Sequence, residues 1–531
     1  MSEETHSESE VADKPVEKDY HLDIHGKHYA RNTMFVLMLI ATFGGMLSQT
    51  FLGTAYPTLM DKFNISLATA QGATTWFLLA NGIMVPVSAY LTTKFSTKWL
   101  FFVAYVGVFI GTIICYSAPT DNWNIFLLGR IVQAASVGIS LPLFQTVGVS
   151  IFPPEKIGVP MGLGGMVMGL APAIGPTYAG WILSSHNKFL GFIQLGDWRT
   201  IFVVPLLMTG ISAILAPFIM RDVLKNRDTK LDYLSLFLSV VGFGLFLLGF
   251  TNVSSDGWGN FTSVLLPIIG GLILVFLFGW RQLRIDDPFL DLSVFKNRQF
   301  LWATINGAII TIAMLGVEMM LPTYVQNVHG LSAFQSGLLL LPGSIMMAVM
   351  SPIAGGIYNK RGARMLSVIG FTMLAIGTLP FMFLTATTPE HFITTTYWLR
   401  FVGIGMVMMP LVTSAMSALP MEKVAQGSAS NNAVRMIASS VGVAIFASVT
   451  QNVMTNAQPS SHMQTTNPLA YAADMINAAL KGFHMSFAIA FGVAVLGILA
   501  AFMLHRGKIM HLPDGTEVDS LAADKAEGGQ A

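Results

Sequence analysis

The stretch Met161–Trp181 reads MGLGGMVMGLAPAIGPTYAGW and contains six glycines and two prolines but no charged residue. It is long enough to cross the hydrocarbon core of a membrane, which is about 30 Å thick. Small residues let membrane helices approach closely, and a proline bends a helix where neighbours satisfy the freed carbonyl groups. The stretch therefore predicts a closely packed membrane helix. Its packing is either static or part of a movement, and the rest of the chain must distinguish the two.

Apolar segments of similar length recur along most of the chain. Of its 531 residues, 53% are hydrophobic and 11% are charged, whereas about a quarter of the residues in a soluble domain are charged. The segments lack the alternation of polar and apolar residues that the strands of a membrane barrel show. We therefore predict an all-α polytopic protein that is embedded in a lipid bilayer.

The charge and the cysteine content exclude several classes of function. A net charge of +1 argues against nucleic acid as a partner, and Cys115 is the only cysteine, which rules out an intramolecular disulfide and thiolate metal clusters. The sequence contains no Walker motif, no HExxH motif and no Ser/His/Asp arrangement. We therefore expect no enzyme activity, no metal and no cofactor, and no direct use of ATP.

Fourteen membrane spans are predicted. The first eight are Thr33–Pro57, Ala70–Leu91, Trp99–Ser117, Asn124–Phe152, Gly158–Leu183, Ile201–Met220, Tyr233–Phe250 and Val264–Trp280. The last six are Leu301–Val325, Ser336–Tyr358, Met365–Leu384, Thr394–Leu419, Gly427–Val453 and Phe487–Leu504.

The spans predict five regions. These are a disordered cytoplasmic tail (1–31), a six-helix bundle (32–220), linkers with two extra spans (221–298), a second six-helix bundle (299–505, with an outer loop at 454–485) and a cytoplasmic tail (506–531).

The basic residues of the loops predict the orientation. If the N-terminus is cytoplasmic, the inner loops hold 15 Lys and Arg residues and the outer loops hold 4, tails excluded. The inner ones are Lys94, Lys98, Lys156, Arg221, Lys225, Arg227, Lys230, Arg281, Arg284, Lys296, Arg298, Lys360, Arg361, Arg364 and Lys423, and the outer ones Lys62, Lys188, Arg199 and Lys481. Because cytoplasmic loops carry the excess of positive charge, we expect both termini in the cytoplasm and the protein in the cell membrane.

The chain contains an internal repeat. Lys94 and Lys360 occupy the same place in two corresponding loops. Arg130 and Arg400 lie on the fourth spans of the two bundles, and the length of chain between them is almost the same as that between the two lysines. Parallel repeats of this kind build two-bundle transporters, in which the substrate site lies between the halves near the bilayer midplane. The repeat therefore predicts a transporter with two pseudo-symmetric bundles and two inserted helices.

Two loop motifs and one helix motif carry a resemblance to a known family. The loops are Ala89–Phe101, with Thr93 where the pattern has aspartate and Ser96 where it has glycine, and Gly355–Arg364. On the fourth span, Arg130 and Gln133 fit an RxxQG pattern in which Ala134 replaces the glycine. These motifs resemble those of the major facilitator superfamily, specifically its fourteen-helix drug:proton antiporters. The resemblance implies that the loops gate the movement of the bundles, through Lys94, Lys98, Asn359, Lys360, Gly362 and Arg364.

The opening stretch is similar to the fifth-helix antiporter motif of this family. Its matching residues are Gly162, Ala171, Gly175, Pro176, Ala179 and Gly180. The spacing favours a helix that moves over one that packs statically, and the resemblance implies antiport rather than symport.

Further matches point to one branch of the family. The segments Trp76–Gly82, Pro322–Gln326 and Gly427–Arg435 are most similar to the lincomycin-resistance exporters of Gram-positive bacteria. Many relatives carry an aspartate in the first helix, where this chain has Ser48. That departure removes the usual proton carrier of the first helix and the reason for strict selectivity for cations.

Four charged residues are predicted inside the spans, namely Glu318, Arg130, Arg400 and Arg435. A charge in the membrane is expensive and normally faces a bundle interior or an ion pathway. At 1.5 Å per residue, the first three lie roughly 10–13 Å below the outer surface. Glu318 is either a protonatable switch that bridges to Arg130 or Arg400, a permanent ion pair with Arg400, or an interfacial carboxylate. Arg435 either lines the site or binds carbonyl groups at a helix end.

Polar residues within the spans are candidates for the substrate cavity. They are Gln49, Trp76, Asn81, Gln145, Asn306, Tyr397, Asn431 and Asn432, together with Arg435. Each Asn or Gln could instead form a hydrogen bond between helices, which is the commoner role in membranes.

The leading interpretation is a proton-coupled exporter of small amphipathic molecules such as drugs, working by alternating access and functional as a monomer. The alternatives are an exporter of an endogenous lipid or metabolite and a membrane receptor that does not transport.

Overall fold

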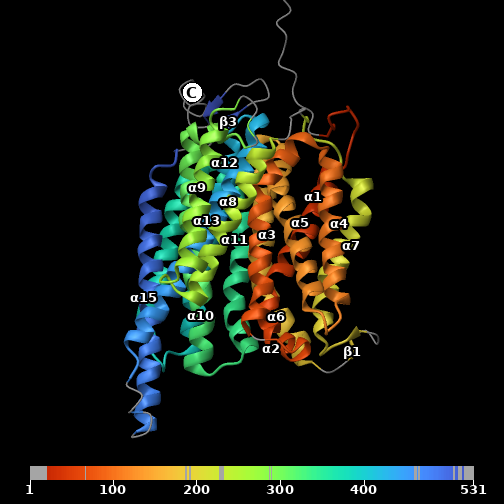
Figure 1. Ribbon diagram of the computed structural model, residues 1–531. Coiled ribbons are helices and arrows are strands. Elements are labelled where there is room, and N and C mark those ends of the chain that lie inside the picture. Colours follow the sequence, from red (N-terminus) through yellow and green to blue (C-terminus); the bar gives the residue numbers. More distant parts are fainter. Residues whose placement is uncertain are drawn as a thin grey trace, which may run out of the picture.

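A computed structural model describes residues 21–65, 67–185, 188–189, 193–226, 232–285, 288, 290–459, 463, 467–505, 509–511 and 517–519. Long helices run side by side and form two bundles, with the first half of the sequence in one and the last half in the other (Figure 1). Both ends of the described chain lie at the same end of the molecule. We call this end the terminal end and the other the opposite end.

The N-terminal bundle consists of α1 to α7. Their bounds are Arg31–Thr50, Leu52–Phe63, Leu67–Lys94, Thr97–Ser117, Trp123–Ser150, Gly158–Ser184 and Val203–Ile219. Only Phe51, with helical angles, separates α1 from α2, so the first span continues beyond the predicted end at Pro57. It ends at Asn64, whose left-handed conformation (φ 52°) terminates the helix.

The C-terminal bundle consists of α10 (Arg298–His329), α11 (Ala333–Thr378), α12 (Glu390–Ser417), α13 (Val424–Asn456) and α15 (Pro468–Ala501). At 1.5 Å per residue, α11 would be roughly 70 Å long, about twice the thickness of a membrane core. Gly362 interrupts it with non-helical angles (φ 69°, ψ −173°) that suit glycine. The described residues contain 13 helices that could span a membrane when α11 is counted once, and the break divides α11 into two spans, which gives fourteen. The predicted fold with fourteen spans is therefore confirmed.

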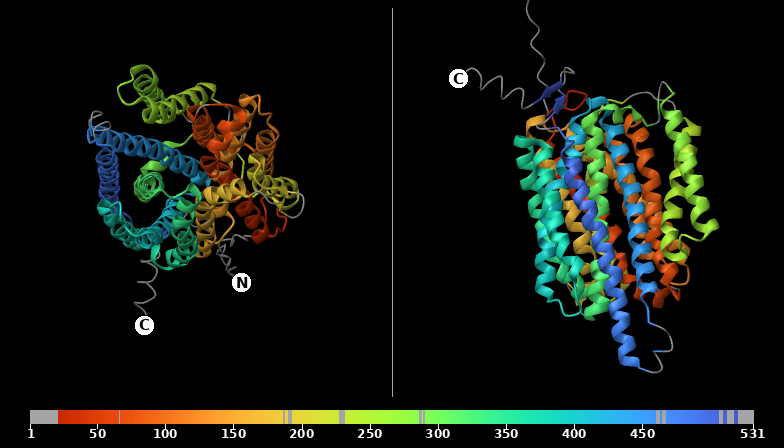
Figure 2. Two further views of the ribbon diagram at one scale, coloured as in Figure 1. Left: turned by 90° about the horizontal axis from the view of Figure 1, so that it is seen from below. Right: turned by 90° about the vertical axis from the view of Figure 1, so that its left-hand side faces the viewer.

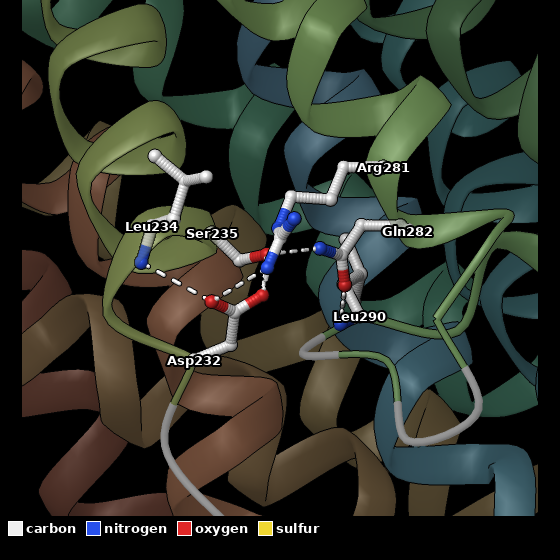
Figure 3. A network of polar contacts seen from close by, with 6 residues as sticks. All are labelled: Asp232, Leu234, Ser235, Arg281, Gln282 and Leu290. Atoms are coloured by element: carbon white, nitrogen blue, oxygen red, sulfur yellow. Dashed lines mark hydrogen bonds and ion pairs between the residues drawn. The ribbon is translucent and has the colours of Figure 1, made fainter.

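The two inserted helices form a hairpin on the outside of the bundles (Figure 2). They are α8 (Tyr233–Asp256) and α9 (Leu266–Gln282). At the terminal end, Arg281 donates to both carboxylate oxygens of Asp232 at 2.9 and 3.2 Å, and Gln282 donates to Ser235 at 2.6 Å (Figure 3). These bonds join the first turn of α8 to the last turn of α9, so the two helices form one unit.

Short elements connect the long helices. They are Pro154–Lys156, Trp198–Phe202, Leu292–Lys296, Leu379–Phe383 and Met421–Lys423 as 3₁₀ helices, and Phe261–Leu265 as a π-helix. Two antiparallel strand pairs join β1 (Lys188–Phe189) to β2 (Ile193–Gln194) and β3 (Ile509–His511) to β4 (Glu517–Asp519), with Lys188 opposite Gln194 and Ile509 opposite Asp519.

The segment 454–485 differs from the predicted outer loop. The helix α15 begins at Pro468, well before the predicted start of the span at Phe487, and its first turns extend beyond the bundles at the opposite end (Figure 2). Its N-terminal part, LAYAADMINAAL, is rich in alanine and apolar residues and therefore continues the helix. Because part of this stretch is polar, hydropathy alone did not show that the helix begins well before the predicted span.

The predicted tails are only partly described. Residues 1–20 and most of 506–531 lie outside the described residues. Residues 21–30, predicted as disordered, form a turn in which Leu22 pairs with His28, and the amide of Ile24 donates to the carbonyl of Asp222 at 2.9 Å. This backbone pairing fixes a segment that its polar composition alone would leave unfolded.

Several pairs of helices join the bundles. The helix α6 packs against α11, and α3 packs against α13. The glycines of α6 allow the first contact, because an added Cβ at Gly158 or Gly162 would overlap the backbone of Gly355 or Ser351. The terminal parts of α3 and α13 also contact α8, which lies against both halves.

Candidate functional site

Arg130 is fully buried on α5 and links three helices of the N-terminal bundle. Its Nη1 donates to the carbonyl of Ser48 on α1 at 2.7 Å and to Oε1 of Gln133 at 2.8 Å. Gln133 donates in turn to the hydroxyl of Thr112 on α4 at 2.7 Å. The guanidinium also lies over the ring of Phe77, 4.3 Å from its centroid. These partners hold Arg130 in place without a carboxylate among the described residues.

Arg400 is fully buried on α12 and makes the corresponding links in the C-terminal bundle. Its Nη2 donates to the carbonyls of Ala313 and Met314 on α10, the latter at 3.2 Å, and its Nε donates to the hydroxyl of Thr378 on α11 at 3.1 Å. Backbone carbonyls and a hydroxyl therefore bind Nε and Nη2 in place of the predicted permanent ion pair, whereas Nη1 is buried without a partner among the described residues.

The two arginine sites are related by the internal repeat. Thr112 and Thr378 are separated by the same length of chain as Lys94 and Lys360. Each threonine ends a hydrogen-bond path that starts at the arginine of its bundle. Sequence analysis missed both threonines, although their offset would have pointed to them.

Glu318 is half-buried on α10, about one turn beyond the carbonyls that bind Arg400. Its charge lies within electrostatic range of Arg400 and Tyr397. Among the described residues it has no hydrogen bond and no ion pair within 4.0 Å. The other acidic residues of the described long helices lie in the first two turns or the last turn of their helices. Glu318 is therefore a carboxyl in the interior of a span with no hydrogen-bond or ion-pair partner among the described residues.

Three side chains that we call the terminal clasp join the two bundles closer to the terminal end than Glu318. They are Gln145 on α5, and Ser428 and Asn432 on α13, all buried. Asn432 donates to Oε1 of Gln145 at 2.6 Å, and Ser428 donates to the same oxygen and to the carbonyl of Pro142, both at 3.0 Å. Gln145 and Asn432, predicted to line the cavity, are therefore engaged in bonds between helices in this conformation.

Two further bonds join the halves near the loop motifs. Gln426 at the start of α13 donates to the hydroxyl of Thr93 at 3.0 Å. The amide of Gly158 at the start of α6 donates to Oδ1 of Asn359 at 2.9 Å. Thr93 and Asn359 immediately precede Lys94 and Lys360 and are therefore equivalent positions of the repeat. Each loop motif thus contacts the first turn of a helix in the other bundle.

The other predicted gating residues lie near these contacts. Lys94 lies over the ring of Tyr90 and Lys98 over the ring of Trp99, each at 5.6 Å. Lys360 is exposed, Gly362 forms the break in α11, and Arg364 lies over the ring of Phe502 at 5.6 Å.

The antiporter motif places α6 between two helices of different bundles. On one side, Thr50 donates to the carbonyl of Ala171 at 3.1 Å, and an added Cβ at Gly175 would overlap the hydroxyl of Thr50. On the other side, a Cβ at Gly162 would overlap α11, and Gly180 faces Phe334. Ala179 is buried and the carbonyl of Pro176 accepts a bond from Thr54 at 3.4 Å. The motif thus supplies the close approach on both faces of α6.

Two of the remaining predicted cavity residues, Asn306 and Asn431, make hydrogen bonds within the C-terminal bundle, and the others differ in their burial. Asn306 does not face the other bundle, because it donates to the carbonyls of Trp302 and of Ala500 on α15, within its own bundle. Asn431 donates to Thr304 on α10 at 3.1 Å. Tyr397 is buried against Phe401 and Gly343, Asn81 is buried, Gln49 is half-buried and the ring of Trp76 is 42% exposed.

Arg435 differs from the other two arginines. It is half-buried on α13, one turn beyond Asn431 and Asn432. Among the described residues it has no hydrogen-bond or ion-pair partner, and its Nη1 is buried without one. The predicted alternative, in which it binds carbonyls at a helix end, is not found.

Ion pairs at the terminal end fix the linker around the extra helices. Hydrogen bonds from Arg281 lower the pKa of Asp232 to about 2. Burial raises the pKa of the Asp291 carboxyl, but hydrogen bonds from Ser293 and Lys423 outweigh it, so the pKa is lowered. Lys423 lies 2.9 Å from Asp291, which ties the linker to the start of α13. In the part of the chain that the structure describes, no group of three or more His, Cys, Asp and Glu side chains could hold a metal ion.

Comparisons with known proteins agree with this architecture. The profile of the Major Facilitator Superfamily matches residues 38–443. The Bacillus subtilis protein named Uncharacterized MFS-type transporter YcnB is 38% identical over 91% of this chain and 97% of its own. The lincomycin resistance protein LmrB of the same organism is 34% identical over 91% of this chain and 98% of its own. The solved proton:xylose symporter XylE shares the fold, with a TM-score of 0.59, 14% identity and coverage of 93% of this chain and 99% of its own.

Proposed function

The chain belongs to the major facilitator superfamily, and on this premise we propose that it is a proton-coupled exporter of small amphipathic compounds in the cell membrane, with both termini in the cytoplasm. The similarity to lincomycin resistance proteins over almost the whole chain supports export of toxic organic compounds. The excess of Lys and Arg in the loops of the terminal end supports the orientation.

The observation that carries the coupling is the position of Glu318. It is an unpaired carboxyl inside a span, beside an arginine that binds two backbone carbonyls and a hydroxyl instead. A carboxyl in such a place can take a proton from the opposite end and release it when the bundles rock toward the terminal end. No metal or organic cofactor is needed for this exchange, because the proton gradient supplies the energy.

The bonds between the halves support alternating access. The terminal clasp and the pairs Gln426–Thr93 and Gly158–Asn359 close the terminal end. Opening that end requires these bonds to break while α6 pivots between α1 and α11. A helix with glycine on both contact faces offers little steric resistance to such a movement.

Transport by the purified protein tests the proposal. The protein is reconstituted in liposomes, a pH gradient is imposed, and the movement of a fluorescent amphipathic dye is followed. We expect the dye to move in the direction opposite to the flow of protons. This movement should stop when a protonophore collapses the pH gradient. Binding of the dye without gradient-dependent movement would contradict the proposal and favour the receptor alternative.

A further inference from the structure

Arg435 is the unexplained charge of the bundle interior. A guanidinium inside the membrane is energetically costly unless it is paired. Arg130 and Arg400 each bind backbone carbonyls, although Nε and Nη2 of Arg130 and Nη1 of Arg400 are buried without a described partner. Arg435 differs because none of its nitrogens makes a hydrogen bond among the described residues. Its buried Nη1 therefore has an unused capacity to donate to an acceptor that the chain itself does not supply.

The neighbours of Arg435 fix the direction in which it projects. Asn431 faces α10, where it bonds Thr304, and Asn432 faces α5, where it bonds Gln145. At 3.6 residues per turn, Arg435 projects about 40° from the direction of Asn431 and about 60° from that of Asn432. It therefore projects between α10 and α5, one turn farther from the terminal end than Asn432 of the terminal clasp.

An open space lies on α10 at the same level. Gly307 is buried, yet a Cβ added there would meet no described atom outside its own helix within 4 Å. It lies one turn beyond Thr304, as Arg435 lies one turn beyond Asn431. Gly307 also shares a face of α10 with Glu318, three turns closer to the terminal end. The face that carries Glu318 thus borders a space at the depth of Arg435.

The charges around this space are unbalanced. The interior of the described spans holds three guanidinium groups and one carboxyl group. The first helix adds no acid, because Ser48 stands at the family's usual acidic position and donates to its own helix at Gly44. Glu318 lies roughly 30 Å along α10 from the terminal end, whereas Arg435 lies roughly 16 Å along α13, so the two charges are separated. An anion would find a free positive partner there, and a cation would not.

We propose that the substrate carries an anionic group, such as a carboxylate or sulfonate, which binds Arg435 while its apolar part occupies the space beside Gly307. This inference rests on the proposed export function and specifies its substrate class. A charge-assisted bond to a guanidinium in a dry site is stronger than a neutral one, and the planar donor fork suits two acceptor oxygens.

Binding of matched probes to the full-length protein in nanodiscs of uncharged lipid tests the proposal. The probes share one scaffold: naphthalenesulfonate, neutral naphthalenesulfonamide and naphthyltrimethylammonium. We expect wild type to bind the sulfonate about tenfold or more tightly than the sulfonamide. Arg435→Gln should bring the two within about twofold, and Arg435→Lys should keep part of the preference.

The variant Gly307→Leu tests the position of the space. We expect it to fold, because its Cβ would meet no described atom outside its own helix within 4 Å, and it should weaken binding of the sulfonate and of the sulfonamide alike, by about tenfold. If Arg435→Gln fails to fold, Arg435→Lys and Gly307→Leu still decide the outcome. No preference for the sulfonate in wild type, or the same preference in Arg435→Gln, would overturn the inference. Stabilisation by chloride alone, without sulfonate binding, would also overturn it.

A transport measurement separates this inference from the proposed function. Each probe is tested in liposomes with an imposed pH gradient. If the cation is exported but the sulfonate does not bind, the substrate class is wrong and the export function stands. If the sulfonate binds through Arg435 but no probe moves with the gradient, the anion site stands and the export function is wrong.

Discussion

Arg130 and Arg400 make the same connection in the two bundles, since each donates to backbone carbonyls of the first helix of its own bundle. The acceptors are Ser48 in one bundle and Ala313 and Met314 in the other. Neither guanidinium depends on a carboxylate among the described residues. The two sites differ in one respect, because only the second has an acid, Glu318, on the next turn of that helix. The two bundles are therefore related by the repeat, but in the part of the chain that the structure describes only the C-terminal bundle has an acidic residue beside its buried arginine.

The first prediction concerns Glu318→Gln. Because Arg400 binds carbonyls and Thr378 and makes no hydrogen bond to Glu318, losing the acid should leave these bonds in place, and the free energy of unfolding should change by less than about 0.5 kcal/mol. Proton-driven export should fall by about tenfold or more, because the amide cannot exchange a proton. Expression level, unfolding temperature and substrate-induced proton release are measured together on this variant.

The outcome of that experiment distinguishes the hypotheses. Normal folding with normal proton release would show that Glu318 is not the proton carrier. A large loss of folded protein, by roughly 3–5 kcal/mol, would instead restore the static ion pair with Arg400.

The second prediction compares two glycines of the antiporter motif. Gly175→Leu should lower transport by about tenfold or more, because the added Cβ would overlap the hydroxyl of Thr50 and lie 3.1 Å from the backbone nitrogen of Phe51. Gly180→Ala serves as the control, since its Cβ would meet Phe334 at an ordinary 3.4 Å. Transport rates are compared at equal amounts of folded protein. Equal transport by both variants would mean that close packing at Gly175 is not needed.

The third prediction concerns the terminal clasp. Asn432→Ala removes the bond to Gln145, worth about 1 kcal/mol, and should favour opening of the terminal end by roughly fivefold. Spin labels at the exposed residues Phe95 and Met421, one on each bundle, should show a larger population at long distance. The native Cys115 is buried, so background labelling should be low.

A matched variant controls for loss of an asparagine. Asn306→Ala removes bonds within one bundle and should leave the distance distribution unchanged. If both variants shift the distribution equally, the clasp does not hold the terminal end closed.

The fourth prediction concerns pH. A carboxyl whose pKa is lowered by folding contributes stability above the unfolded pKa of 3.8 and loses it as the pH falls through about 2. The bond between Asp232 and Arg281 should therefore persist from about pH 7 to about pH 4.5. Hydrogen exchange in the first turn of α8, corrected for its intrinsic rate, should be equal at both values. A loss of protection at the lower pH would contradict the lowered pKa.

The variant Asp232→Asn isolates the charge in this contact. The asparagine oxygen can still accept from the amide of Leu234 and cap α8, but it cannot form the ion pair. We expect protection to fall by about twofold to fivefold at both pH values, a modest effect because Arg281 is partly exposed.

The fifth prediction concerns orientation. A cysteine at Leu469, which is 86% exposed at the opposite end, should react with an impermeant reagent added outside cells. A cysteine at Met421 should react only after the membrane is permeabilised. The reverse pattern would place the termini outside and overturn the assignment from the loop charges.

The sequence by itself determined the membrane fold, the fourteen spans and the two related bundles. Length and hydropathy are local properties, and a membrane forces each apolar segment of about 20 residues into a helix. The correspondence between the loops of Lys94 and Lys360 likewise needed no coordinates. The start of α15 at Pro468 was missed, because part of that stretch is polar and helices continue beyond the apolar core.

The tertiary structure alone decided which polar groups meet. Gln145, Asn306 and Arg435 look alike in sequence, as polar residues within apolar spans. The first bonds the other bundle, the second bonds α15 and the third has no partner among the described residues. Those outcomes depend on the rotation and crossing of helices that lie far apart in the chain. A hydrogen bond requires a partner within about 3.5 Å, and only packing sets that distance.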